Sequence, residues 1–558
     1  MIKFFTNRFA AMTAACALSF VLGSFVSNKL IDNTITLAVV KEAEKLSGLK
    51  LSLAQEDSTL NGLNDHLKAY EEIQKLGIKN SIVPALNFNP IPVGFVYPDQ
   101  KNGFLLDKQS TVNLPTDRNE LAFYSIRQLA ELIRTKKITS VELTEFFLAR
   151  LKKFNPKLLA VVSFTDDLAL KQAAKADAEI AAGHYRGVLH GIPFAVKDLL
   201  SAKDYKTTFG AAPYKDQQFD VDATVVKSLE DAGAVLIAKL SLGELAMDDT
   251  WFGGRTNNPW DLKKGSGGSS AGPGAAVSAG CVPFAIGSET WGSIVEPSSN
   301  CGDTGLRPSF GRVSKYGAMA LSWSMDKLGP MARTVEDCAI VFNAIQGKDP
   351  NDLSTISAPF NYDGKQNSLK GWKIGYLKAD FQSKYPNRHN DSLTLVKLKA
   401  LGATLIPIEL PKLPFNSMNF ILDAEAGAAF QELVLTHRSD LLARQEKAAW
   451  PNIFRTAQFI PAVEYIQANR VRTLLVQNWY EKLKGLDLYI SPSYSDNLLM
   501  TNLTGNPCVV LPNGFTAKGL PTSITFMGQL FGEGKTLEAA RIYQNATDFH
   551  LKHPTINL

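Results

Sequence analysis

The chain has 558 residues, of which 45% are hydrophobic, so it is long enough to bury a large core. Its 59 basic and 54 acidic residues leave a small positive excess, and the basic residues form no stripe with interleaved aromatic side chains. No zinc-ligand spacing occurs among the five cysteines and seven histidines. The composition therefore argues against a nucleic-acid partner and against a zinc site.

Residues 1–30 have the composition of an export signal. Lys3 and Arg8 precede an apolar run over residues 9–26, and we expect the mature protein to begin within residues 23–32. No clear Ala-x-Ala cleavage site follows the run, so an uncleaved membrane anchor is the alternative. Either way the body of the protein is expected to be extracytoplasmic, periplasmic or secreted. No later segment is apolar enough for a further crossing.

Cysteine usage favours free thiols. Cys16 lies in the apolar run, and four other cysteines lie among small or apolar neighbours: Cys281, Cys301, Cys338 and Cys508. Such surroundings are typical of buried thiols, with one disulfide as the alternative.

Residues 31–116 are expected to form a helical and proline-rich extension. Ser52-x-x-Gln55 resembles a capping box, and large apolar residues recur at helical spacing over residues 60–70. Five prolines then keep the chain extended: Pro84, Pro90, Pro92, Pro98 and Pro115. We expect this segment to wrap the main domain, residues 117–558.

Two helices and a buried strand are predicted at the start of the main domain. Thr139-x-x-Glu142 opens a helix with one apolar face, and an alanine-rich helix follows over residues 168–182. The strand, residues 191–198, ends in Lys197 and Asp198, whose side chains alternate between opposite faces. Most lysines are solvated surface groups, but a buried lysine has a lowered pKa and can act as a base.

A glycine- and serine-rich stretch, residues 265–294, is predicted to form an active-site floor. Glycines allow tight turns and close approach of backbone amides to a reacting atom, while serines supply hydroxyl groups. A flexible linker is the alternative. However, residues 275–277 and 282–286 within the stretch are apolar and predict a small-residue helix followed by a buried strand.

Successive short motifs in the main domain resemble those of the amidase signature hydrolases, over roughly residues 122–558. They are Gly191-Ile192-Pro193 with Lys197-Asp198, Asn257-Asn258-Pro259-Trp260, Gly267-Gly268-Ser269-Ser270, Gly292-Ser293-Ile294, Cys301-Gly302 and Gly305-Leu306-Arg307-Pro308. Less specific matches follow at Glu425-Ala426 with Phe430, at Leu503-Thr504-Gly505-Asn506-Pro507 and at Gly519-Leu520-Pro521.

The resemblance implies an α/β fold with a large mixed central sheet sandwiched by helices, and a Ser-cisSer-Lys triad. Ser293 would be the nucleophile, Ser269 the relay and Lys197 the base, with a cis peptide bond between Gly268 and Ser269. These roles make chemical sense, because the attacking hydroxyl must lose its proton and a neutral lysine can accept it through Ser269.

The resemblance also implies an oxyanion hole made of four backbone amides, those of Thr290, Trp291, Gly292 and Ser293. Three residues depart from the family pattern around it. Trp291 stands where glycine is usual, Val295 where arginine is usual, and Glu289 where aspartate is common. Since amide donors do not depend on the side chain, these changes bear on the substrate range and on a local ion pair.

Three other motifs compete for the active site. Gly268-x-Ser270-x-Gly272 fits the α/β-hydrolase elbow, but residues 258–264 read as a loop where that elbow needs a buried strand. Ser324-Met325-Asp326-Lys327 with Ser495-Asp496-Asn497 resembles two penicillin-binding-protein motifs, yet the third is missing and Gly329-Pro330 would end the required helix. A phosphate loop lacks its Gly-Lys-Ser/Thr ending.

The sequence therefore predicts an exported serine amidohydrolase that cleaves carboxamide C–N bonds other than ordinary peptide bonds through an acyl-enzyme. A small-molecule amide is the expected partner, no metal or organic cofactor is expected, and a membrane would be contacted only through the N-terminal segment. An esterase, an amidotransferase A-type subunit and an inactive binding relative are the alternatives. Residues 423–468 are expected to line the substrate entrance.

Overall fold

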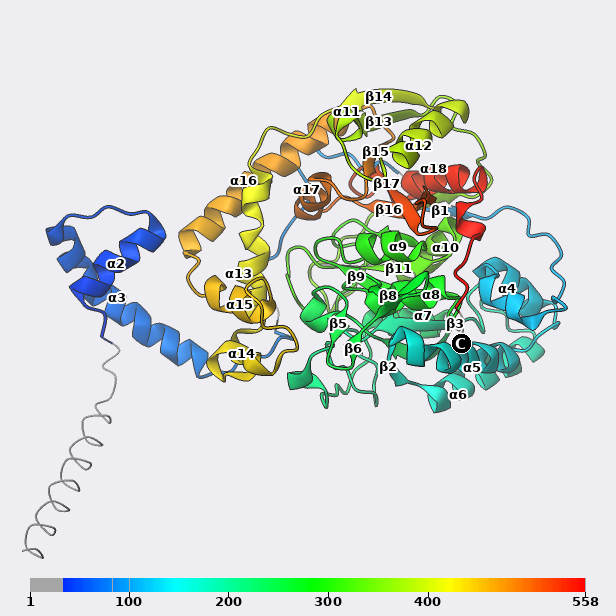
Figure 1. Cartoon of the computed structure of the whole chain (residues 1–558), viewed down its shortest axis with the longest axis horizontal. Helices are drawn as coiled ribbons and strands as arrows, with labels where there is room; N and C mark the ends of the chain where they lie inside the picture. Colours follow the sequence, from blue (N-terminus) through cyan, green and yellow to red (C-terminus); the bar gives the residue numbers. More distant parts are fainter. Residues whose placement is uncertain (1–33, 83, 100, 557–558) are drawn as a thin grey trace, which may run out of the picture. The chain divides into compact units, whose positions relative to one another are not determined.

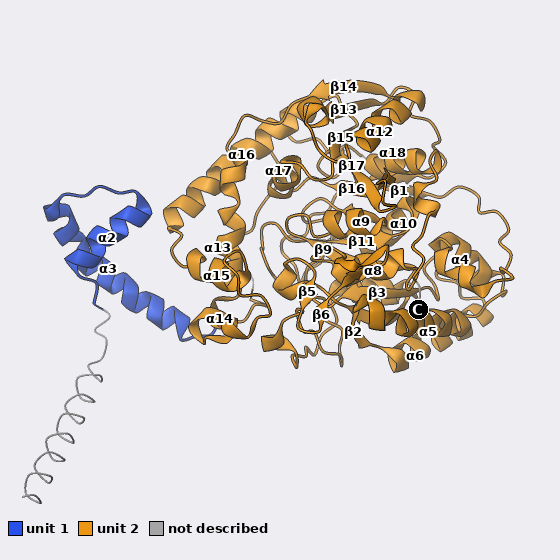
Figure 2. Ribbon diagram, viewed as in Figure 1, with its two compact units in different colours: residues 1–78 blue, residues 79–558 orange. Residues whose placement is uncertain are grey.

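A computed structural model describes residues 34–82, 84–99 and 101–556 (Figure 1). The predicted export signal, residues 1–30, lies outside these residues. The chain divides into two compact units, residues 1–78 and 79–558 (Figure 2). Within the described ranges, no helix is both long enough and apolar enough to cross a membrane.

The described part of the first unit is a helical hairpin. Helix α2 (Leu37–Ser47) is followed by α3 (Leu53–Gln74), which begins with the predicted capping box of Ser52 and Gln55. The Asn64 side chain bonds both the backbone N–H and the backbone C=O of Ile35, at 2.8 and 3.1 Å, and so joins α3 to the residues that precede α2. The helix predicted in this segment is confirmed.

The proline-rich residues that follow belong to the second unit. The amide of Val93 donates to the Gln477 side chain at 3.1 Å. Strand β1 (Gly103–Leu105) pairs in parallel with β12 (Asn361–Asp363), far along the chain. Because proline supplies no N–H, this segment has few internal hydrogen bonds, such as the one from the Phe95 amide to the Pro92 carbonyl at 3.3 Å, and bonds to distant parts of the unit help to fix it.

The second unit is organised around a mixed sheet of eleven strands (Figure 1). In hydrogen-bonded order they are β14 (Thr404–Ile408), β13 (Lys373–Leu377), β15 (Leu488–Pro492), β17 (Pro521–Gly528), β16 (Cys508–Phe515), β10 (Thr304–Arg307), β11 (Lys327–Ala332), β9 (Phe284–Glu289), β3 (Pro193–Lys197), β4 (Val235–Leu240) and β2 (Val161–Phe164). Strand β13 runs parallel to both of its neighbours, as does β3, and the other pairings are antiparallel. The predicted large mixed sheet is confirmed.

Helices cover both faces of this sheet. Helices α8 and α9 pack on each other, as do α10 and α18, and both pairs contact the same central strands. On β10, Thr304 Oγ1 accepts from Gln544 of α18 at 3.1 Å, whereas a Cβ on the next residue, Gly305, would meet Ser298 of α9. Since successive residues of a strand face opposite sides of the sheet, the two pairs lie on opposite faces. The helices of the unit are α4 (Ile126–Arg134), α5 (Ser140–Leu158), α6 (Asp166–Ala181), α7 (Thr224–Asp231), α8 (Ala271–Ser278), α9 (Val295–Cys301), α10 (Val335–Ile345), α11 (Lys378–Gln382), α12 (Arg388–Ala400), α13 (Phe420–Ala429), α14 (Gln431–Leu435), α15 (Trp450–Ala457), α16 (Ala462–Leu483), α17 (Asn497–Thr504) and α18 (Glu533–Asn545).

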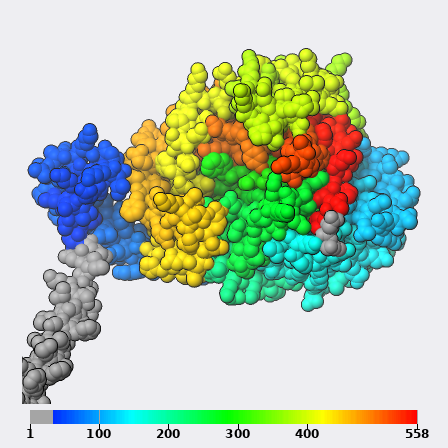
Figure 3. All heavy atoms as spheres, in the orientation of Figure 1, coloured from blue at the N-terminus to red at the C-terminus, as the bar shows by residue number. Residues whose placement is uncertain are grey.

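Short elements complete the unit. Its 3₁₀ helices are η1 (Arg118–Phe123), η2 (Ala212–Tyr214), η3 (Glu244–Ala246), η4 (Phe415–Met418), η5 (Arg438–Leu441) and η6 (Phe549–Leu551). Strands β5 (Thr250–Trp251) and β6 (Gly254–Arg255) form one ribbon. The residues after α18, red in Figure 3, lie at the surface of the unit.

The central strands are buried along their whole length, which explains their sequence pattern. Every residue of β3 and of β9 is buried. Strands covered on both faces are typically continuous apolar runs, and β3 begins with Pro193, a position where proline disrupts no ladder. The predicted strand at 191–198 and the two helices before it, α5 and α6, are confirmed.

One prediction for this region is wrong. Residues 258–264, expected to be a loop, lie mostly in a two-stranded ribbon of β7 (Asn257–Asn258) and β8 (Asp261–Gly265). The ribbon has no apolar alternation, because it lies outside the main sheet and is held by polar bonds. One of these joins the Trp260 indole N–H to the Cys301 carbonyl at 2.7 Å.

The four described cysteines are buried and form no disulfide, as predicted: Cys281, Cys301, Cys338 and Cys508. Burial raises the pKa of the Cys281 thiol to about 12, so this thiol is held protonated and unreactive.

Candidate active site

The three predicted triad residues come from a strand of the sheet and from two loops beside it. Lys197 is the last residue of β3, and β9, its parallel neighbour, leads into the turn that carries Ser293. Ser269 lies just before α8. The amide of Ser270 donates to the Ser293 carbonyl at 3.1 Å, which joins the loop of the predicted relay to the loop of the predicted nucleophile.

Lys197 is fully buried among hydroxyl groups. Its Nζ lies 2.8 Å from Ser269 Oγ, 3.1 Å from Ser270 Oγ and 2.9 Å from Ser288 Oγ. Burial lowers the pKa of this lysine well below its usual range, and Asp326 and Glu289 oppose the shift only in part. Burial therefore favours the uncharged form of this amine, which lies against the Ser269 hydroxyl.

The hydrogen bonds around Lys197 limit which neighbouring hydroxyl group can donate a proton to it. Ser270 Oγ donates to the Ser288 carbonyl at 3.0 Å, so it can only accept from Lys197. A neutral amine has two N–H donors and one lone pair, and these match three neighbouring hydroxyls. With Ser270 as one acceptor, the second N–H and the lone pair face Ser288 and Ser269, and proton transfer from Ser269 uses the arrangement in which the lone pair faces Ser269.

The neighbouring carboxylate of Asp198 does not pair with Lys197. Its Oδ1 lies 2.8 Å from Nζ of Lys239, and both side chains are fully buried. Its Oδ2 accepts from the Thr208 amide at 2.9 Å. Asp198 therefore has its own cation, which leaves Lys197 free to stay uncharged.

The peptide bond between Gly268 and Ser269 is cis, as the family resemblance implied. A Cβ at Gly268 would lie 1.7 Å from the Asp248 carbonyl oxygen, so only glycine fits this position. The Gly243 amide donates to the Ser269 carbonyl at 3.2 Å, which further fixes the loop that carries Ser269.

The predicted oxyanion hole is a turn with free amide donors. Gly292 has φ of 89°, a conformation that favours glycine. In the described part of the chain, no group accepts a hydrogen bond from the amides of residues 290–293. Thr290 is fixed through its side chain, which donates to Asp326 Oδ1 at 2.6 Å. A row of unpaired amides is what a developing oxyanion requires.

Glu289 closes this turn. Its Oε2 accepts from the amides of Ile294 and Val295, both at 3.0 Å, and its Oε1 accepts from Arg307 at 2.7 Å and from Asn502 at 2.8 Å. Burial alone would raise the pKa of Glu289, but the Arg307 guanidinium and these hydrogen bonds outweigh it and lower the pKa to about 2. The carboxylate is thus charged and paired.

The local ion pair that the sequence left in doubt is therefore present, and its cation is Arg307. Val295, where arginine is usual in the family, is fully buried and apolar. Arg307 comes from β10 and also donates to Thr501 Oγ1 and to the Asn506 carbonyl, both at 3.0 Å. These bonds tie the turn to α17 and to the residues that follow it.

The competing serine motifs do not form alternative sites. Ser324 precedes strand β11 where the penicillin-binding-protein motif needs a helix, and its hydroxyl donates to Glu425 and accepts from Arg472. Strand β8, before the elbow-like motif, is half-exposed and lies outside the main sheet. Among the described residues, no group of three or more His, Cys, Asp or Glu could hold a metal ion.

Three contacts of the site were not predicted. Ser288 contacts Lys197, Asp326 holds Thr290, and Arg307 pairs with Glu289. The contact of Ser288 could have been anticipated from side-chain alternation along β9, because this places Ser288 and Glu289 on opposite faces of the sheet. The other two depend on sheet order, for which the sequence carries no local signal.

Trp291 is not part of the core. Its side chain is 44% exposed, and it sits in the turn between Thr290 and Gly292, beside the amides that would hold the oxyanion. The alternative that the ring packs beneath the sheet is therefore wrong. A large exposed ring at this position is suited to contact the acyl group of a substrate.

We expect Trp291→Gly to change substrate preference with little loss of stability. The backbone donor is kept, and removal of a half-exposed ring should cost about 1 kcal/mol or less of unfolding free energy. Bulkier acyl groups should gain in kcat/KM relative to small ones. Trp291→Phe, which keeps an aromatic ring, is the control. A large fall in Tm with unchanged acyl preference would contradict the assignment.

Comparison with known proteins shows the family to which this chain belongs. The sequence model of the Amidase family matches residues 142–500. The glutamyl-tRNA(Gln) amidotransferase A-subunit of Coxiella burnetii (strain RSA 493 / Nine Mile phase I) is 34% identical over 481 residues, covering 77% of this chain and 99% of that protein.

Comparison with solved structures also finds amidases. An amidase family protein from Bacillus anthracis str. Ames matches with a TM-score of 0.71 and 27% identity, covering 78% of this chain and 93% of that one. The native peptide amidase from Stenotrophomonas maltophilia matches with a TM-score of 0.67 and 30% identity, covering 76% and 96%. The chain therefore belongs to the amidase signature family.

Proposed function

We propose that this protein is an exported amidohydrolase that cleaves non-peptide carboxamide C–N bonds through an acyl-enzyme, with Ser293, Ser269 and Lys197 as its triad. One observation carries the proposal: a fully buried lysine, its pKa lowered by burial, lies 2.8 Å from the hydroxyl of Ser269, on a loop bonded to that of Ser293. Such an amine is a base at neutral pH.

In the first half-reaction Ser293 Oγ attacks the amide carbonyl carbon. Its proton passes to Ser269, whose own proton passes to the lone pair of Lys197. The carbonyl oxygen becomes an oxyanion, which the unpaired amides of residues 290–293 stabilise. The tetrahedral intermediate then collapses, the C–N bond breaks, and the proton held by Lys197 returns through Ser269 to the leaving amine.

In the second half-reaction a water molecule attacks the acyl-enzyme. Its proton follows the same route to Lys197, and the ester bond to Ser293 breaks as the carboxylic acid forms. Ser293 then regains its proton through Ser269. Each proton that enters the relay leaves it again, so the mechanism needs no metal ion and no organic cofactor.

A substrate panel tests this proposal. Purified protein should hydrolyse at least one of the aryl amides, fatty amides, amino-acid amides or peptide amides, and a Ser293→Ala variant prepared in parallel subtracts contaminating activity. Esters of the same acids separate an amidase from an esterase by their relative kcat/KM. If the purified protein hydrolyses none of these amides, the result would support the alternative that it is an inactive binding relative.

An amidotransferase subunit is the second candidate, favoured by the 34% identity to proteins of that name over almost their whole length. It predicts a cytosolic chain that begins at Met1 and gains activity only with partner subunits. Export predicts a mature N-terminus within residues 23–32 and activity of the isolated protein. N-terminal sequencing and an assay of the protein alone, with glutamine among the substrates, distinguish the two.

A further inference from the structure

We propose that the turn between α2 and α3, residues 46–53, inserts into the surface of a lipid bilayer. The turn has the sequence Leu-Ser-Gly-Leu-Lys-Leu-Ser-Leu, with four leucines in eight residues. This interaction is separate from the proposed amidase activity, and it goes beyond an anchor in the N-terminal segment.

The leucines of this turn are held outward by well-formed local structure. Leu46 is 67% exposed, Leu49 56% and Leu53 73%. Helix α2 ends at Ser47 and is capped by Gly48, whose φ of 72° is left-handed, and the capping box of Ser52 starts α3. Three exposed leucine side chains therefore lie within eight residues of this helical hairpin, at its turn.

The described part of the hairpin has almost no core of its own. Its buried side chains are Val40 and Glu56. Single exposed leucines are common on protein surfaces, but neighbouring ones that nothing in the unit covers usually mark a contact site. Burial of these leucines outside the unit would release water from apolar surface.

Two exposed lysines beside the leucines can bind the phosphates of lipid headgroups. Lys45 and Lys50 flank Leu46 and Leu49, and both lysine side chains are exposed. Lysines beside an apolar turn can keep their ammonium groups at phosphate level while the leucines enter the acyl region. Lys45 also bonds Glu42 at 2.6 Å, but this pair is solvent-exposed and easily exchanged for a phosphate.

A bilayer fits this turn better than a protein partner. A stable protein interface buries about 800 Å² on each side, far more than three leucines in one turn offer. Lipid contact needs no such area when it adds to a second membrane signal, and the apolar residues 9–26 supply one wherever they are retained as the uncleaved anchor. Val26 and Leu37 are 11 positions apart (37 − 26), so at most about 40 Å of chain separates that run from α2.

Fluorescence quenching in the full chain tests the proposal. Leu49→Cys in a Cys16→Ser background would be labelled with an environment-sensitive fluorophore, since the four other cysteines are buried. An interfacial segment lies about 5 to 10 Å into the headgroup and acyl boundary, so vesicles with brominated upper acyl chains should quench the label about twofold or more. The label should also shift its emission to the blue.

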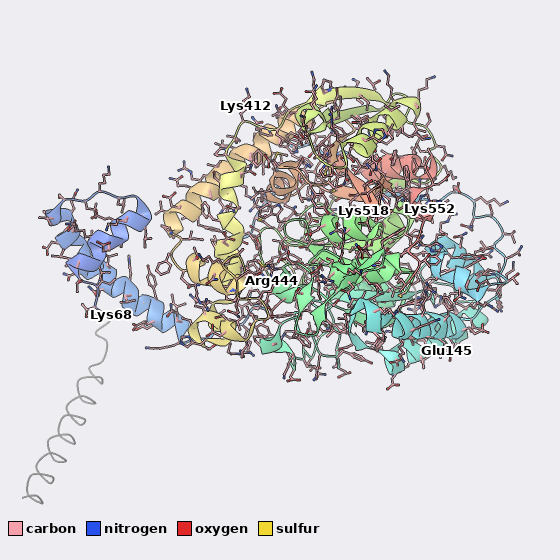
Figure 4. The ribbon with its side chains drawn as sticks, viewed as in Figure 1. Lys68, Glu145, Lys412, Arg444, Lys518 and Lys552 are labelled. Atoms are coloured by element: carbon pink, nitrogen blue, oxygen red, sulfur yellow. The ribbon has the colours of Figure 1, made fainter. Side chains whose placement is uncertain are left out.

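A label at Lys68 is the positional control. Lys68 is exposed on α3 (Figure 4), 15 positions after Leu53, which is about 22 Å along the helix. This label should not be quenched. With the label at position 49, Leu46→Ser with Leu53→Ser should remove the quenching, whereas Leu86→Ser with Leu353→Ser, two leucines that are each 82% exposed in the other unit, should not.

Three outcomes would overturn the proposal. The first is a label at position 49 that vesicles leave unquenched. The second is equal quenching at positions 49 and 68. The third is a blue shift that needs no vesicles and grows with protein concentration, which would show that a second copy of the chain covers the turn.

Discussion

Ser293→Ala will abolish amide turnover, with kcat falling about 10⁴- to 10⁶-fold, because the variant lacks the atom that bonds to the substrate. Ser269→Ala and Lys197→Ala will leave small residual activities. Since the three residues act as one unit, Ser269→Ala with Lys197→Ala will be little worse than either change alone. The measurement is kcat on the best amide of the panel, with Tm recorded for every variant.

Ser288→Ala is the matched control for Ser269→Ala. Both hydroxyls contact the same lysine at almost the same distance, 2.9 and 2.8 Å, but only the loop of Ser269 is bonded to that of Ser293. Ser288→Ala should therefore keep most of the activity, with a shifted pH profile. Full activity in Ser269→Ala, or equal losses in the two variants, would contradict the relay.

The pH dependence follows from the state of Lys197. Burial lowers the pKa of this lysine well below its usual range, so the neutral form that accepts a proton is populated at lower pH than in a solvated lysine. As the pH falls through that lowered pKa, the lysine becomes protonated and kcat/KM should fall. The acid limb of the pH–rate profile should be absent from the residual activity of Lys197→Ala. Addition of EDTA should change nothing, and inhibition by it would contradict the mechanism.

The sequence predicted most of this site because its signals are local. The apolar run ending in Lys197 predicted a buried strand, and the glycines around Ser269 predicted a tight loop. The roles came from the family resemblance. What could not be predicted depends on residues far apart in the chain: Asn502 bonds Glu289 across 213 positions, and only the order of the strands brings the two together.

The boundary between the two units illustrates the same limit. Composition predicted one extension over residues 31–116, but the compact units meet between Ile78 and Lys79. Proline content indicates that a segment is extended, and it does not indicate what the segment packs on. Strand β1 lies in this segment and pairs with β12, a contact that no local pattern predicts.

Arg307→Met should reduce kcat by about 100-fold and lower the free energy of unfolding by about 3 to 5 kcal/mol. Arg307 is fully buried and is the cation against Glu289, whose other oxygen holds the amides of Ile294 and Val295. Without the guanidinium, burial will raise the pKa of Glu289. In its charged form the unpaired carboxylate would repel the oxyanion that forms in the same turn. KM should change less than kcat, since the amides act on the transition state.

Two further variants separate positioning of the turn from general stability. Glu289→Gln with Arg307→Met removes both charges, and the glutamine Oε1 can still accept from the amides of residues 294 and 295, so stability and kcat should both recover in part. Arg307→Lys keeps the charge but cannot also reach Thr501 and Asn506 as the planar guanidinium does, so it should be intermediate.

Comparison of kcat with Tm shows whether Arg307 positions the turn or only stabilises the fold. If Arg307→Met melts earlier yet keeps the wild-type kcat well below its Tm, the ion pair only stabilises the fold. If the double variant regains Tm but not kcat, the charge itself is needed at the turn. Recovery of both would show that Arg307 serves to neutralise Glu289.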